Sequence, residues 1–235
     1  MAYDHSKLRR RSIRLKGYDY AQAGAYFVTI CSHGHQCVFG RCLDEEMALS
    51  KFGEVVAACW HDMPRHFQGV ELDAFVIMPN HVHGVVVIAR DNEGARDNVG
   101  ATHASPLPRP RGPKRQSVAA IVGSFKSAST RHINKLRGAP GAPVWQRNYY
   151  EHVIRNKDGL NRIRGYVLTN PLRWALDREN PERTGEDDFD RWLASFHTRP
   201  DSDKAAGRTV PVPFRPGPRP RLCRGLGAVR PYRGR

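Results

Sequence analysis

The stretch that most constrains this chain is Phe75–Ile88, an apolar and β-branched run (FVIMPNHVHGVVVI) that carries two histidines two residues apart. Such a run favours a β-strand, in which alternate side chains lie on the same face. His81 and His83 are therefore expected side by side on a rigid element. Imidazole is a common ligand of divalent metal ions, and a same-face pair can bind one ion. The spacing alone is equally compatible with two ordinary histidines at the end of a strand.

The charge of the chain predicts a polyanionic partner. Its 38 Lys and Arg residues against 23 Asp and Glu residues leave a formal net charge of +15, and phosphate backbones attract such an excess. No apolar run is long enough to cross a bilayer, so no membrane association is expected. The polar, basic start predicts no signal peptide. Five cysteines without a Cys-x-x-Cys pair predict a reducing, cytosolic compartment.

Composition divides the chain into three parts. Residues 1–20 form a basic arm, 21–182 form the folded domain, and 183–235 form a polar and then Arg-, Pro- and Gly-rich tail. The folded domain contains a flexible basic connector at 91–116. Residues 204–235 hold nine Lys or Arg and no acid, which cannot bury a core, so this part is expected to be disordered. The arm is either a solvated leader or a phosphate-binding segment.

Short β-branched and aromatic runs predict strands at 26–31, 38–39 and 70–77, in the histidine-bearing run, and at 144–148. His33 and His35 follow the first of these strands in a turn and are interpreted as loop residues.

Apolar periodicity predicts three helices. The first covers 45–61 and is stopped by Pro64, and the second covers 117–136 with Ser117 as its N-cap. The third begins with Asp158 as its cap and ends at Asn170, because the following proline disfavours the helical conformation there.

The third predicted helix carries a tyrosine and an amide on one face. Tyr166 and Asn170 are four residues apart, so their side chains lie one turn from each other. A tyrosine can attack a phosphodiester and retain the phosphate as a covalent ester, and an amide oxygen with two imidazoles suits Mg²⁺ or Mn²⁺. From spacing alone, a packing tyrosine and a helix-ending asparagine explain the pattern as well.

Several segments resemble one known group of proteins. FVIMPNHVHGVVVI is similar to the histidine–hydrophobic–histidine motif of the HUH single-strand DNA endonucleases. KGYDYAQAGAYFVTIC, VWQRNYYEHVIRN and LNRIRGYVLTNP resemble the REP-associated tyrosine transposases, which are relatives of the Y1 transposases. The similarity extends over roughly residues 8–175, with the blocks in the same order, and leaves out the tail.

The resemblance implies an α+β fold of ferredoxin-like type, an antiparallel sheet with helices packed on it, and a role for individual residues. His81 and His83 match the metal ligands, and Tyr166 matches the nucleophile. Asn170 stands where related transposases commonly carry a glutamine ligand, so its shorter side chain leaves its ligation open. Tyr149 and Tyr150 remain alternative nucleophiles.

The activity implied by the resemblance is a Mg²⁺- or Mn²⁺-dependent single-stranded DNA endonuclease and strand transferase. It would act at hairpins of repetitive palindromic elements through a 5′-phosphotyrosine, as a monomer or homodimer at the nucleoid of a bacterial cytoplasm. Basic side chains are the candidate phosphate contacts: Arg9, Arg10, Arg11, Arg14, Lys16, Lys126, Arg131, Lys135 and Arg147. Trp145, Tyr149 or Tyr150 could stack unpaired bases. Core packing also explains Trp145.

Two other function classes remain open at this stage. One is a noncatalytic protein, derived from a transposase, that binds or regulates DNA hairpins. The other is a basic RNA-binding domain with a structural histidine pair, which a DNA-versus-RNA competition would distinguish through the 2′-hydroxyl.

Overall fold

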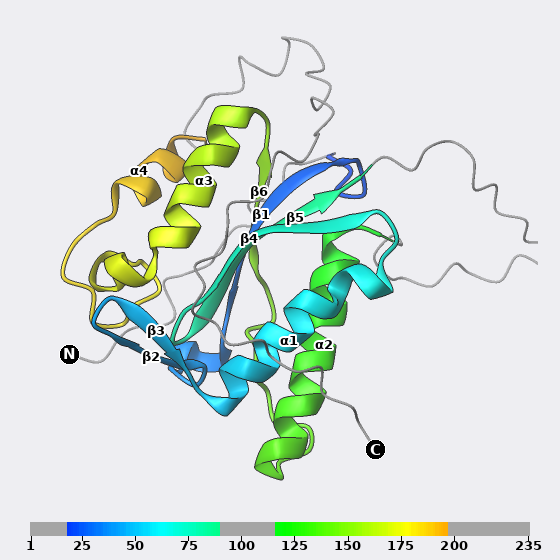
Figure 1. Cartoon of the computed structure of the whole chain (residues 1–235), viewed down its shortest axis with the longest axis vertical. Helices are drawn as coiled ribbons and strands as arrows, with labels where there is room; N and C mark the ends of the chain where they lie inside the picture. The colour runs from blue at the N-terminus through cyan, green and yellow to red at the C-terminus, as the bar shows by residue number, and fades with distance from the viewer. Residues whose placement is uncertain (1–17, 90–115, 197–235) are drawn as a thin grey trace, which may run out of the picture.

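The computed structural model describes residues 18–89 and 116–196 (Figure 1). The arm residues Arg9, Arg10, Arg11, Arg14 and Lys16, nearly all of the connector and the tail from residue 197 lie outside these ranges. None of the helices in the two ranges is both long enough and apolar enough to cross a membrane.

A four-stranded antiparallel sheet forms the centre of the molecule. It contains β1 (Gly24–Cys31), β4 (Val70–Ile77), β5 (His81–Ile88) and β6 (Tyr150–Ile154) in the order β4-β5-β1-β6. With α1 (Lys51–His66) before β4 and α2 (Val118–Arg137) before β6, the chain follows a βαββαβ path. This path and strand order are those of a ferredoxin-like fold, and the predicted fold class is confirmed.

Helices cover both faces of the sheet (Figure 1). α1 and α2 bury apolar side chains against Val28, Val82 and Val86 on one face. On the other face, α3 (Lys157–Thr169) and the short α4 (Asp188–Ser195) pack against Phe27 and Val85. β5 is therefore buried on both sides, which explains its nearly continuous apolar sequence.

The register of β1 and β5 decides which face carries the polar residues. Thr29 pairs with His83, and Cys31 pairs with His81. Because side chains alternate along a strand, these four share the face that packs against α3. Polar groups therefore gather at one end of the apolar core under α3.

The first predicted helix was placed too early in the sequence. Glu46–Leu49 forms strand β3, which pairs with β2 (Gly40–Leu43) in a hairpin. α1 begins only after Ser50, whose side chain accepts a hydrogen bond from the Gly53 amide. Pro64 lies inside the last turn instead of stopping the helix, which continues to His66. Residues 38–39, predicted as a strand, precede β2.

The other two helices agree with their sequence signals. Ser117 caps α2, and Gly138 ends it in the left-handed conformation with φ 63°. α3 is capped by Asn156, not by the predicted Asp158, and ends at Asn170. After Pro171 the chain continues as the 3₁₀ segment η3 (Pro171–Leu176).

The last strand differs from the prediction. Residues 144–148 were expected to form it, whereas β6 begins at Tyr150 and pairs with β1. Trp145 makes an isolated bridge with Ser32, and its ring packs against Phe39 and Phe125 with 6% of its surface exposed. Its role is core packing, so base stacking by Trp145 is excluded in this conformation.

Candidate active site

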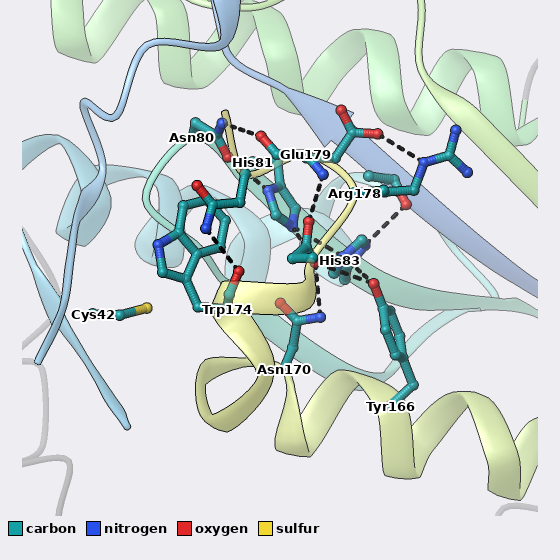
Figure 2. Close-up of polar contacts among 12 residues, drawn as sticks. Cys42, Asn80, His81, His83, Tyr166, Asn170, Trp174, Arg178 and Glu179 are labelled. Carbon is teal, nitrogen blue, oxygen red and sulfur yellow. Dashed lines mark hydrogen bonds and ion pairs between the residues drawn. The ribbon is translucent and has the colours of Figure 1, made fainter. Parts of the chain in front are cut away.

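The two histidines of β5 converge on one point below α3. His81 and His83 are fully buried, and their Nε2 atoms lie 2.9 Å apart (Figure 2). Two lone pairs at this distance would repel each other, so a proton or a metal ion must lie between the rings.

Neighbouring polar groups orient both rings. The Asn80 side-chain nitrogen donates to the backbone oxygens of Glu179 (2.6 Å) and His35 (3.3 Å), so its Oδ1 faces His81 Nδ1 at 2.8 Å. His81 therefore carries its proton on Nδ1 and presents the Nε2 lone pair to the site. His83 Nδ1 lies 2.9 Å from the Thr29 hydroxyl.

A carboxylate that the sequence did not single out completes this group. Asp177 follows η3, and its Oδ2 lies 3.7 Å from His81 Nε2 and 3.6 Å from His83 Nε2. Its Oδ1 accepts a hydrogen bond from the Glu179 amide at 2.7 Å. The carboxylate is buried and has the donor atoms of both histidines on the same side.

The helix α3 adds the tyrosine and the amide. The Tyr166 hydroxyl donates to Asp177 Oδ2 at 3.2 Å and lies 3.2 Å from His83 Nε2. The Asn170 nitrogen donates to the same Oδ2 at 3.0 Å. Figure 2 shows both side chains pointing from α3 toward the histidines. Sequence spacing had placed them on one face, and the structure brings that face onto the histidine pair.

Tyr166 is covered from the side opposite the site. Its ring stacks on Phe189 of α4, with centroids 3.7 Å apart and planes 8° apart, and it is 4% exposed. The stacking fixes the ring direction and therefore the position of the hydroxyl.

Burial and charge set the protonation states. Burial lowers the pKa of His81 to about 4, against the opposing effect of Asp177, so the ring is neutral near pH 7. Burial, together with the charge of Asp177, raises the pKa of Tyr166 well above its usual value. Burial also acts to raise the pKa of Asp177, but His81 and His83 outweigh it and the pKa is lowered.

The three converging atoms fit a divalent cation. His81 Nε2, His83 Nε2 and Asp177 Oδ2 are separated by 2.9, 3.6 and 3.7 Å, and ligands at about 2.0–2.2 Å from one ion are separated by about 3–3.5 Å. Asn170 Oδ1 is buried and has no hydrogen-bond partner in the described ranges, so it offers a fourth donor. Imidazole with oxygen ligands suits several divalent ions.

The alternative tyrosines lie elsewhere. Tyr149 packs with the core on the α1/α2 face. Tyr150 lies on the α3 face, opposite Thr29, with its ring edge toward Phe27, and burial raises its pKa. Of the three predicted candidates, Tyr166 is the one whose hydroxyl contacts both His83 and Asp177.

The predicted DNA contacts inside the described ranges lie away from this group. Arg131 and Lys135 are exposed on α2, on the opposite side of the sheet, and Arg147 is exposed before β6. The Lys126 ammonium donates to the backbone oxygens of Gln146 and Arg147.

The residues missed at the sequence level had weak signals. Asp177 stands alone in an irregular segment, without the periodicity of a helix or strand. Asn80 is one polar position in the histidine-bearing run, and Thr29 is one position of the strand predicted at 26–31. Only their contacts across the fold indicate that they orient or complete the site.

Comparisons with known proteins give one extensive match. The chain is 40% identical over 169 residues to an uncharacterised protein of Haemophilus influenzae, covering 72% of this chain and 92% of that protein. No family model matches. Among solved structures, a REP-associated tyrosine transposase bound to a REP hairpin is 15% identical, with a TM-score of 0.43 over 66% of this chain and 70% of that one. A transposase-like protein of Deinococcus radiodurans is 18% identical, with a TM-score of 0.36 over 66% of this chain and 96% of that one.

Proposed function

The chain belongs to the same family as the Haemophilus influenzae protein, and we propose that it is a metal-dependent single-strand DNA endonuclease and strand transferase of the HUH type. One observation carries the proposal: a single tyrosine hydroxyl lies 3.2 Å from both a histidine and a carboxylate of a three-residue group whose donor atoms converge as metal ligands do. The motif resemblance and the excess of positive charge point to DNA as the substrate.

In this proposal Tyr166 is the nucleophile. Its oxygen forms a bond to phosphorus, the bond from phosphorus to the 3′-oxygen breaks, and the strand leaves with a 3′-hydroxyl. The other strand end stays on Tyr166 as a 5′-phosphotyrosine. The phenol proton has an acceptor at 3.2 Å in Asp177 Oδ2. Attack by another 3′-hydroxyl reverses these bond changes and joins the strands.

His81, His83 and Asp177 would hold the cation, proposed as Mg²⁺ or Mn²⁺, and Asn170 would supply a further oxygen or orient Asp177. When bound, the ion polarises the phosphate and offsets the negative charge that raises the tyrosine pKa. Asn80 and Thr29 hold the rings so that both Nε2 atoms face it.

The substrate proposed is a hairpin of a repetitive palindromic element, because three sequence blocks resemble the REP-associated tyrosine transposases. All groups invoked come from one chain, so cleavage in cis by a monomer is proposed, with a homodimer compatible. Tyr150, on the α3 face of the sheet, would stack an unpaired base. The arm and α2 would bind the flanking phosphates.

A covalent-adduct assay tests the proposal. Labelled single-stranded repeat hairpins, taken from the genome that encodes the chain, are mixed with the protein and Mn²⁺ and separated on a denaturing gel. We expect a metal-dependent adduct that is lost in Tyr166→Phe and His81→Ala. The double variant Tyr149→Phe/Tyr150→Phe is the matched control and should retain it. An adduct lost only in that double variant would show that the nucleophile is Tyr149 or Tyr150 and not Tyr166.

A second candidate function is noncatalytic hairpin binding. The burial of Tyr166 beneath Phe189 favours it, because a nucleophile must reach its substrate. This function predicts tight hairpin binding that is unchanged in Tyr166→Phe, and no adduct with either metal. That pair of results would overturn the enzyme proposal.

A further inference from the structure

A second group of metal-binding side chains lies beside the first. It consists of Cys31, the last residue of β1, His35 in the turn η2 (His33–His35), and Glu179, two residues after Asp177. One donor atom of each lies within 4.8 Å of the other two. Cys31 and Glu179 are buried, His35 is half-buried, and Cys31 forms no disulfide.

The fold brings these three segments together through the same asparagine that orients His81. Cys31 pairs with His81 across β1 and β5, which places it on the α3 face. The chain then reverses through Gly34 and His35, with φ of 64° and 55°. The Asn80 side chain donates to the backbone oxygens of both His35 and Glu179. The Asn80 side chain therefore ties the His35 and Glu179 segments together, and the pairing of β1 with β5 places Cys31 beside them.

The charges around the group favour ionised ligands. Glu179 Oε1 lies 3.4 Å from Arg178 Nε, and its Oε2 lies 3.4 Å from His35 Nδ1 (Figure 2 shows Arg178 and Glu179). The two carboxylate oxygens thus have separate partners, and one is directed at the imidazole. The Lys126 ammonium interacts electrostatically with Cys31.

We propose that Cys31, His35 and Glu179 form a binding site for a thiophilic divalent cation of the zinc class, separate from the candidate active site. Thiolate, imidazole and carboxylate together are a zinc donor set, whereas Mg²⁺ is bound by oxygen ligands. Ligands at about 2.0–2.3 Å from one ion are about 3–4 Å apart, so the observed group needs only a small contraction.

The position of the site gives it a structural role. An ion there joins the end of β1, the turn η2 and the segment that carries Asp177. Because the Glu179 amide donates to Asp177 Oδ1 at 2.7 Å, fixing Glu179 also fixes that carboxylate. This coupling rests on the proposed function, whereas the binding site itself does not.

Cobalt binding tests the site with a signal that only thiolate ligation produces. The full-length protein is stripped with chelator and titrated with Co²⁺ under reducing conditions, and the thiolate-to-cobalt charge-transfer absorption is recorded. We expect the band in the wild type, in His81→Ala, which disrupts the other group, and in Cys59→Ser, a half-buried thiol on α1. It should be lost in Cys31→Ser. No band in the wild type, or a band that persists in Cys31→Ser, overturns the proposal.

A second variant keeps the test decisive if Cys31→Ser does not fold. Glu179→Gln retains the shape of the side chain and removes its charge. Competition with a chromophoric chelator should show zinc bound at least about tenfold more weakly, with the exposed Glu182→Gln unchanged. Equal zinc affinity in both variants contradicts the site. Neither measurement depends on Tyr166, so a failed adduct assay leaves this result standing.

Discussion

Asp177 connects the tyrosine and the amide of α3 with the two histidines of β5. It accepts hydrogen bonds from Tyr166, Asn170 and the Glu179 amide, and its Oδ2 faces both histidines. Its carboxylate has two opposing effects. It supplies negative charge for a cation, and the same charge raises the pKa of the adjacent phenol.

Replacing this carboxylate should separate the two effects. In Asp177→Asn we expect Mn²⁺ affinity to fall at least about 10- to 100-fold, because one anionic ligand is lost. Isothermal titration of chelator-treated protein measures the change. Asp188→Asn, an exposed acid on α4, is the control and should bind Mn²⁺ as the wild type does. Wild-type affinity in Asp177→Asn would exclude this residue as a ligand.

At the scale of elements, the position of α3 determines where the Tyr166 hydroxyl lies. Two turns of apolar contacts hold the helix on the sheet through Leu160, Ile163 and Val167. A bidentate ion pair also fixes the orientation of α3 on the sheet. Arg164 Nε and Nη2 donate to the two carboxylate oxygens of Asp73 in β4, at 2.7 and 2.6 Å. This pair links the helix that carries Tyr166 to the edge strand of the sheet.

The Arg164–Asp73 pair should contribute stability with a defined pH dependence. Burial acts to raise the pKa of Asp73, but the Arg164 hydrogen bonds outweigh it and lower the pKa. The folded state therefore binds this proton less readily than the unfolded chain, and the stabilisation is present above the unfolded pKa of about 4. It is lost as the pH falls through the lowered folded value.

We accordingly expect Asp73→Asn to reduce the free energy of unfolding by about 1–3 kcal/mol near pH 7. The difference from the wild type should shrink steadily below about pH 4. Urea unfolding at several pH values measures it. Glu71→Gln, an exposed acid on the same strand, serves as the control. A difference that is independent of pH would show that the lost contact is not electrostatic.

At the scale of the whole molecule, the proposed function makes the net charge of +15 the source of long-range attraction to nucleic acid. The polar site lies beneath α3, whereas Arg131 and Lys135 project from α2 across the sheet. Under the proposed function, these basic side chains and the candidate active site therefore lie on different sides of the sheet. Nine further basic residues stand in 204–235, outside the described ranges.

Salt should therefore weaken DNA binding steeply. We expect the logarithm of the association constant for single-stranded DNA to fall with slope of about −0.7 per phosphate contact against the logarithm of salt concentration. Fluorescence anisotropy measures the slope. Replacing the nine basic residues of 204–235 by glutamine should make the slope less negative. An identical slope would show that these residues make no phosphate contacts.

The sequence alone determined the parts that depend on local chemistry. Alternation in an apolar run placed His81 and His83 on one strand face, and helical spacing placed Tyr166 and Asn170 on one helix face. Capping residues located both ends of α2. The start of α1 was misplaced because the residues of β3 satisfy helical spacing as well as strand pairing. The proposed roles of these residues came from the motif resemblance and remain to be tested.

Only the tertiary structure decided which faces meet. Tyr166 and His83 are 83 residues apart, and Asn80 and Glu179 are 99 apart. Such long-range contacts also determine the position of Asp177 in the candidate active site and the grouping of Cys31, His35 and Glu179. The helical period of three to four residues and the strand period of two residues report only which side chains share a face. They do not encode contacts between segments so distant in the chain, because such contacts arise from how the sheet and the helices pack. The sequence thus specified the strand and the helix, and their packing placed the phenol, the histidines and the carboxylate together.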